Sequence, residues 1–102
     1  MKKLGTLVRI GPLRLKVETV PLIPDDLRGR MDYCDLRVTI MRMNPDAMFR
    51  TFLHEVIHAI LDANGQYDEA RDETLISGLA HGLAGLLRDN AWVRRFYEKE
   101  GK

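Results

Sequence analysis

Apolar residues alternate with polar ones through much of the first forty positions, as in β-strands that bury one face. The alternation covers residues 6–20 and is interrupted by Gly11-Pro12. A Gly-Pro pair between two such runs predicts a β-hairpin. Residues 25–30 predict a short helical turn. Tyr33–Met41 alternates again and predicts a further strand.

Beyond residue 43 the apolar positions recur at helical spacing. Asn44-Pro45 supplies a capping side chain and a proline suited to the first turn, so a helix is predicted from Pro45 to about Ala63. Asn64-Gly65 is a typical helix end. A second helix is predicted from near Asp68 to about Arg88, and a last one from Ala91 to about Glu100.

The second predicted helix combines many leucines with three glycines, Gly78, Gly82 and Gly85. Each glycine lowers helix propensity by about 1 kcal/mol relative to alanine. Small residues also let another backbone approach closely, which offsets that loss. In the last helix we expect Trp92, Phe96 and Tyr97 to pack in the core or in an interface.

The chain has 102 residues, 45% hydrophobic and 30% charged, which is ordinary for a globular protein. We expect one domain over residues 1–102, of the α+β class. It would contain a small N-terminal β-sheet, then two antiparallel helices, then a short C-terminal helix. The net charge of +1 gives no indication of a nucleic-acid partner.

Cys34 is the only cysteine, so neither an internal disulfide nor a cysteine-based metal site can form. This composition favours a reducing compartment, and we expect Cys34 to be a small buried residue. No stretch approaches eighteen apolar residues, and Arg9 interrupts the N-terminal apolar run that a signal peptide would need. The sequence therefore predicts a cytoplasmic protein without a membrane partner.

The motif that carries chemistry is His54-Glu55-Val56-Ile57-His58, an H-E-x-x-H pattern inside the first predicted helix. Residues four apart lie on one face of a helix, so both imidazoles can reach a single Zn²⁺ ion. Glu55 lies beside them, where a carboxylate can take a proton from a metal-bound water.

A catalytic zinc usually takes three protein ligands, so a third must come from outside the motif. Asp62 is discounted, because ligands from one helix cannot close around an ion. Glu73 lies one turn into the second predicted helix, which returns toward the histidines if the two helices are antiparallel. His81 follows Glu73 by eight residues, or about 12 Å of helix, so the two cannot bind the same ion. We favour Glu73 as the third ligand and expect His81 to support a ligand or to be buried in the core. The alternative third ligand is His81 or an acid other than Glu73.

His54–His58 followed by Asp72–Ala80 resembles the ImmA/IrrE-type zincin metallopeptidases, especially their short phage-encoded relatives. In that family the helix after H-E-x-x-H presents a glutamate, and Glu73 matches it. A strand precedes the motif helix there, and Asp35–Met41 fits its place. The resemblance implies a minimal gluzincin-like fold with His54, His58 and Glu73 as zinc ligands and Glu55 as general base.

The expected reaction is metal-assisted hydrolysis of a peptide bond in a peptide or protein substrate. Glu55 would take the proton of the water and pass it to the leaving amine. The strand near residues 36–42 is expected to pair with an extended substrate. Tyr33, Tyr67 and His81 are candidates to stabilise the oxyanion.

Two other functions compete with catalysis. One is a non-catalytic zinc module with a structural or regulatory role in a phage or its host. The other is a small adaptor in which the motif is accidental. The sequence leaves the substrate and the oligomeric state open.

Overall fold

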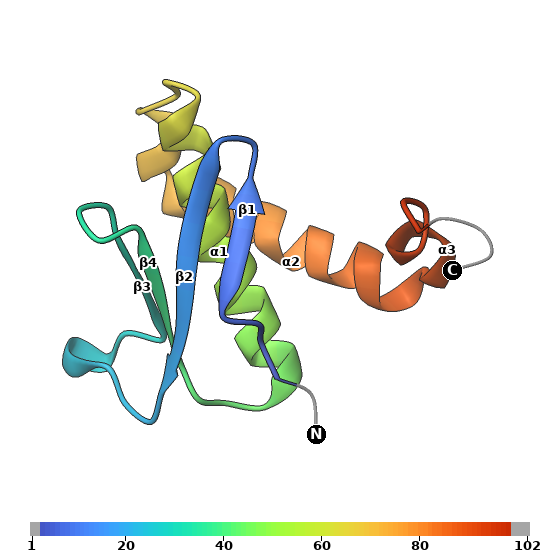
Figure 1. Ribbon diagram of the computed structural model, residues 1–102, viewed down its shortest axis with the longest axis horizontal. Coiled ribbons are helices and arrows are strands. Elements are labelled where there is room, and N and C mark those ends of the chain that lie inside the picture. Colours follow the sequence, from blue (N-terminus) through green and yellow to red (C-terminus); the bar gives the residue numbers. More distant parts are fainter. Residues whose placement is uncertain (1–2, 99–102) are drawn as a thin grey trace.

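The computed structural model describes residues 3–98, which form a four-stranded sheet followed by helices (Figure 1). This confirms the predicted α+β class. The strands are β1 (Leu7–Ile10), β2 (Leu13–Val20), β3 (Gly29–Asp32) and β4 (Arg37–Met41), in the spatial order β1-β2-β4-β3. The helices are α1 (Pro45–Ala63), α2 (Glu73–Asp89) and the short α3 (Ala91–Arg94).

The N-terminal hairpin forms where the alternation predicts it. β1 and β2 are antiparallel, and Ile10 faces Leu13 across the turn. Gly11 has a positive φ of 57°, a conformation that glycine adopts without steric cost. β2 then continues to Val20 and pairs in parallel with β4, which places β4 in the interior of the sheet.

The region between the hairpin and α1 differs from the prediction. A 3₁₀ turn covers only Pro24–Asp26, and the chain from Gly29 onward forms β3, the edge strand. The predicted strand over Tyr33–Met41 was wrong at its start, because residues 33–36 form the turn between β3 and β4. The Asp32 carboxylate accepts hydrogen bonds there from two backbone N–H groups, and Leu36 has a φ of 51°. An Asx turn of this kind ends a strand whatever the β propensity of the residues in it.

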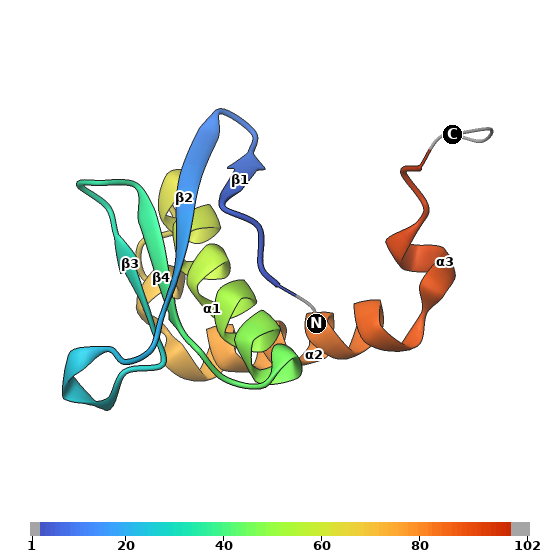
Figure 2. The same cartoon turned by 60° about the horizontal axis from the view of Figure 1, so that its bottom comes forward.

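Helix α1 lies against one face of the sheet (Figure 2). It begins as predicted, because the Asn44 side chain accepts a hydrogen bond from the Ala47 N–H and Pro45 occupies the first turn. Its sheet-facing side joins a buried cluster with the central strands. The buried members of that cluster are Leu15, Val38, Ile40, Met48 and Ala59.

Helix α2 starts five residues later than predicted. A 3₁₀ turn occupies Glu69–Arg71, and Asp72 caps α2 by accepting a hydrogen bond from the Leu75 N–H. The first turns of α2 pack on the side of α1 that faces away from the sheet, where Ile57, Ile76 and Ala80 are buried together. α1 is thus covered on two sides, and a polar strip of its surface remains between the sheet and α2.

The C-terminal part differs from the prediction. α3 ends at Arg94, and the predicted end near Glu100 lies outside the described residues. Trp92, Phe96 and Tyr97 are largely exposed, so they do not join the core, and their place in an interface stays a prediction.

The expected burial of Cys34 was wrong, because Cys34 is exposed in the β3–β4 turn. Among residues 3–98, no helix has both the length and the apolar character that a membrane span needs.

Candidate metal centre

The polar strip of α1 carries the H-E-x-x-H motif. His54 and His58 lie one turn apart, and their Nε2 atoms are 3.3 Å from each other. Their side chains are 22% and 15% exposed, so each ring is held by packing while one edge stays accessible. The helical spacing therefore brings the two imidazoles together as the sequence predicts.

Glu73 joins the two histidines from the first turn of α2. Its Oε1 atom is 2.8 Å from Nε2 of His54, and its Oε2 atom is 3.0 Å from Nε2 of His58. One donor atom from each of the three residues falls within 4.8 Å of the other two. The Asp72 cap fixes where α2 begins and so fixes the position of Glu73.

The three side chains fit a zinc ion by chemistry and by spacing. Two imidazole nitrogens and a carboxylate are the ligand set of many catalytic zinc sites, and a tetrahedral ion with bonds of about 2.0–2.1 Å separates its donors by about 3.3 Å. The histidine nitrogens are already at that separation, and the carboxylate oxygens are slightly closer. Two imidazole nitrogens facing one carboxylate converge on a common point, which an ion can occupy.

Backbone and side-chain contacts behind the histidines orient their rings. Nδ1 of His58 lies 2.6 Å from the carbonyl oxygen of Ala70, to which it donates, so the lone pair of Nε2 faces the centre. On the other ring, Nδ1 of His54 lies 3.4 Å from Oγ of Ser77. Sequence reasoning missed Ala70, because a backbone carbonyl carries no residue-type pattern that would reveal it.

Glu55 lies beside the centre, under the edge strand. Burial raises the pKa of its carboxyl above the ordinary value of 4.5, and Glu73 raises it further, whereas His54 and His58 act in the opposite direction. A Cβ added to Gly29 of β3 would lie 2.6 Å from Cγ2 of Thr51 and 3.2 Å from Cγ of Glu55. Only glycine lets β3 pass this close to Glu55, a role that the sequence alone did not suggest.

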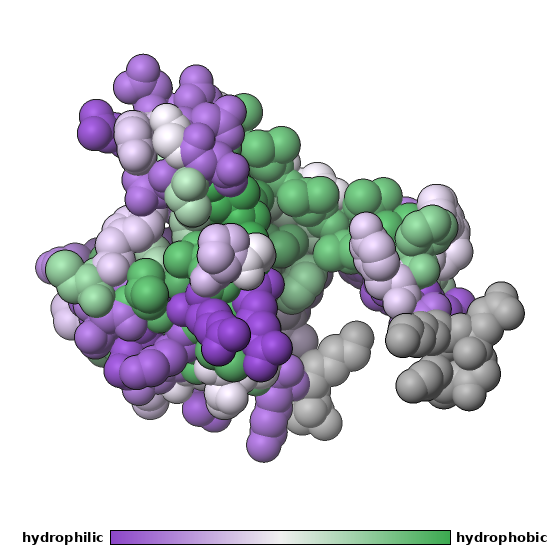
Figure 3. All heavy atoms as spheres, turned by 45° about the horizontal axis from the view of Figure 1, so that its top comes forward, coloured by the Kyte–Doolittle hydropathy of each residue, from purple (hydrophilic) through white to green (hydrophobic). Residues whose placement is uncertain are grey.

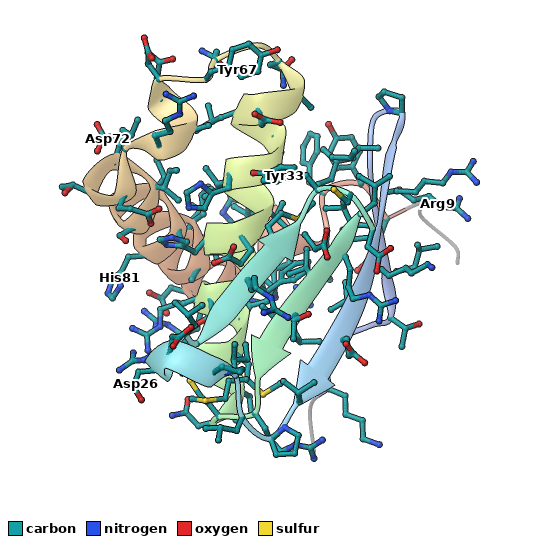
Figure 4. All side chains as sticks on the ribbon, turned by 90° about the vertical axis from the view of Figure 1, so that its left-hand side faces the viewer. Arg9, Asp26, Tyr33, Tyr67, Asp72 and His81 are labelled. Atoms are coloured by element: carbon teal, nitrogen blue, oxygen red, sulfur yellow. The ribbon has the colours of Figure 1, made fainter. Side chains whose placement is uncertain are left out.

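An open cleft of about 740 Å³ runs past these groups. β3 and the segment before it form one wall, α1 forms the floor, and α2 forms the other wall (Figure 4). Besides the motif residues and Glu73, its lining includes Arg28, Tyr33, Arg50, Ser77 and His81.

The three oxyanion candidates differ in position. Tyr33 and His81 line the cleft, whereas Tyr67 is not part of its lining and lies near the far end of α1 (Figure 4). Burial raises the pKa of Tyr33, with Asp62 and Glu55 adding to the shift, so its hydroxyl keeps its proton at neutral pH. His81 is exposed, and the expectation of a buried histidine was wrong.

The strand expected to receive an extended substrate is not available. β4 is hydrogen-bonded on both sides, to β2 and to β3, and so cannot accept another strand. β3 is the edge strand on this side of the sheet, and it borders the cleft.

Comparison of the chain with protein-family models, with curated proteins and with solved structures gives no significant match.

Proposed function

We propose that the chain is a zinc-dependent metallopeptidase with His54, His58 and Glu73 as metal ligands. The convergence of one donor atom from each of the three residues supports this most strongly. Glu55, which the motif places beside the ligands, supplies the base that hydrolysis requires. The resemblance to the ImmA/IrrE-type zincins agrees with this assignment, and the lone free cysteine agrees with a cytoplasmic location.

In this proposal the residues of the chain bind the substrate and move one proton. A zinc ion, when bound, would make water acidic enough to ionise near neutral pH and would polarise the scissile carbonyl. The Glu55 carboxylate takes a proton from the attacking water and delivers it to the leaving nitrogen. Tyr33 or His81 donates a hydrogen bond to the oxygen that becomes negative.

The substrate in this proposal is an extended peptide paired with β3. An edge strand presents unpaired N–H and C=O groups to a chain that lies alongside it. Gly29 brings that edge over Glu55, so a peptide paired with β3 would place its backbone above the general base.

The metal content of the purified protein, by elemental analysis, is the first test. We expect about one zinc per chain, with loss of zinc in both His54→Ala and Glu73→Ala. Asp62→Asn is the matched control, because Asp62 is an acid of α1 outside the cluster of possible ligands. Zinc retained in Glu73→Ala would move the third ligand to His81 or another acid. A parent protein that binds no zinc would overturn the proposal.

A non-catalytic zinc module is the second candidate, because the Glu73 side chain is 65% exposed in a shallow site. Glu55→Gln separates the two functions. A peptidase should keep its zinc and lose at least about a hundredfold in the hydrolysis of a fluorogenic peptide library. A zinc-bound parent with no activity above that of Glu55→Gln would favour the non-catalytic module.

A further inference from the structure

Helix α2 has an apolar face that no other described part of the chain covers. Leu75, Leu79, Leu83 and Leu86 follow one another at helical spacing, and each is about two-fifths exposed. α2 runs past the end of the sheet, with α3 at its far end (Figures 1 and 2). Hydrophobic residues continue along this arm (Figure 3).

Three exposed aromatic residues follow the far end of α2. Trp92 and Phe96 pack edge-to-face with ring centres 6.4 Å apart, and Phe96 and Tyr97 do the same at 5.9 Å. All three side chains are at least two-thirds exposed. Together with the four leucines they form what we call the arm surface.

Two glycines leave the surface of α2 without side chains beside the leucines, and we call this strip the glycine groove. Gly78 follows Leu75 by three residues, and Gly82 is flanked on the helix surface by Leu79 and Leu86. A Cβ added to either glycine would meet no atom within 4 Å, so the fold itself gives no packing reason for them. Glycine weakens an exposed helix, so an open groove at these positions points to a contact outside the chain.

We propose that the arm surface binds a second copy of this chain, with the leucine ridge of each α2 packed into the glycine groove of the other. A two-fold arrangement needs one surface that carries both halves of the contact, and the ridge and groove lie side by side on α2. Small residues along the groove allow two helix backbones to come close, and ridge-into-groove packing is the usual helix contact.

The size of the arm surface suits a dimer. An aromatic side chain contributes about 150–250 Å², and scaled by the exposed fractions the three aromatic residues and four leucines offer roughly 450–800 Å². A standard interface buries about 800 Å² per partner, of which a little over half is apolar. With all of this area buried, the arm surface would supply the apolar part of the interface on one partner.

The charge pattern is compatible with a second copy and argues against a lipid surface. Residues 74–87, which include the four leucines and both glycines, contain no Asp, Glu, Lys or Arg, so this part of the arm surface meets its copy without repulsion. The basic residues Arg94 and Arg95 lie among the aromatic residues at its far end. A helix that binds a lipid surface usually has basic residues along its polar face, and α2 has none before Arg88. An uncharged ridge and groove fit an identical uncharged ridge and groove.

Sedimentation velocity of the full, reduced protein over a range of concentrations tests the proposal. We expect a concentration-dependent dimer in the parent. In Leu79→Glu each introduced charge would be buried in the apolar groove of the partner helix, and the dissociation constant should rise roughly a hundredfold. Leu22→Glu is the control, because Leu22 is 74% exposed but lies in the loop after β2. Its dissociation constant should stay unchanged.

Gly82→Ala keeps the test decisive if Leu79→Glu disturbs the fold. The added methyl fits the isolated chain, so the melting temperature of the dilute protein should rise. The same methyl fills the groove, so the dimer should weaken roughly tenfold. A parent that stays monomeric at all concentrations would overturn the proposal. So would a dimer that neither variant weakens.

Discussion

The region around the histidines and the arm use the same helix, α2, in opposite ways. In its first two turns, Ile76 and Ala80 are buried against α1 and Glu73 meets the histidines. Ala84 continues this buried side in the later turns, whereas the leucines on the other side face solvent from Leu75 onward. Glycines differ in the same way: Gly29 is crowded by Thr51 and Glu55, whereas nothing approaches Gly82. The difference indicates that the face of α2 that carries Ile76, Ala80 and Ala84 is adapted to close packing within the chain, and the face that carries the leucines to an outer surface.

Paired alanine substitutions on the two faces of α2 should give the largest difference. Ile76 is fully buried, so Ile76→Ala should lower the free energy of unfolding by about 2–5 kcal/mol. Leu79 is 44% exposed, and Leu79→Ala should cost about 1 kcal/mol or less in the dilute monomer. Urea denaturation at low protein concentration measures both. Equal losses would show that the exposed face also packs within the chain.

Removal of zinc should affect the two ends of α2 unequally. A ligand that binds only the folded state at a hundred times its dissociation constant stabilises that state by about 2.7 kcal/mol. Because Glu73 would tie α2 to α1, a chelator should speed amide hydrogen exchange most in residues 73–80 and least in residues 83–89. Uniform acceleration along α2 would contradict a metal held only at its first turn.

Gly29→Ala should destabilise the protein by about 1–3 kcal/mol, since its methyl must displace Thr51 or Glu55. Gly5→Ala is the control, because nothing lies within 4 Å of a Cβ added there. In Gly29→Ala/Thr51→Ser the nearest obstructing atom is gone, so part of the loss should be recovered in a double-mutant cycle. If the effects of the two substitutions on the free energy of unfolding are additive, then contact with Thr51 is not the reason that position 29 requires glycine.

The smallest expected effect concerns the pH dependence of the metal-free protein. Burial raises the pKa of Glu55, so the folded state binds the Glu55 proton more tightly than the unfolded chain does. The contribution of Glu55 to the free energy of unfolding is therefore fully present below pH 4.5, and it is lost as the pH rises through the higher pKa of the folded state. Glu55→Gln cannot lose a proton. Its stability relative to the parent should therefore increase from pH 4 to pH 7, as followed by thermal unfolding.

Local sequence patterns predicted the elements whose boundaries depend on local chemistry. The hairpin depends on Gly11-Pro12, and α1 depends on the Asn44 cap, and both form where expected. β3 was missed because four residues at a sheet edge show little alternation, and only pairing with β4 defines them. The leucines of α2 recur at helical spacing, but periodicity shows which residues share a face and does not show what covers it.

In the candidate site, too, sequence patterns predicted some residues and missed others. His54 and His58 follow from helical spacing, and Glu73 was chosen because a returning helix would bring it level with them; the structure places all three together. Residues that act through tertiary contact were beyond sequence reasoning. The Ala70 carbonyl and the missing side chain of Gly29 are both of this kind. The burial of Cys34 and His81 was predicted wrongly, because residue type alone does not fix exposure.

The positions of the proposed ligands also have a consequence for the order of folding. His54 and Glu73 are only 19 residues apart, and the segment between them is mostly α1 and a short turn. The parallel pairing of β2 with β4 closes a segment of similar length, because Lys16 pairs with Arg37. The two closures differ in what lies between their ends: α1 forms from local hydrogen bonds, whereas the segment before β4 becomes ordered through pairing between strands. We therefore expect the helical pair to assemble before the sheet is complete, so that the residues of the proposed metal site come together early.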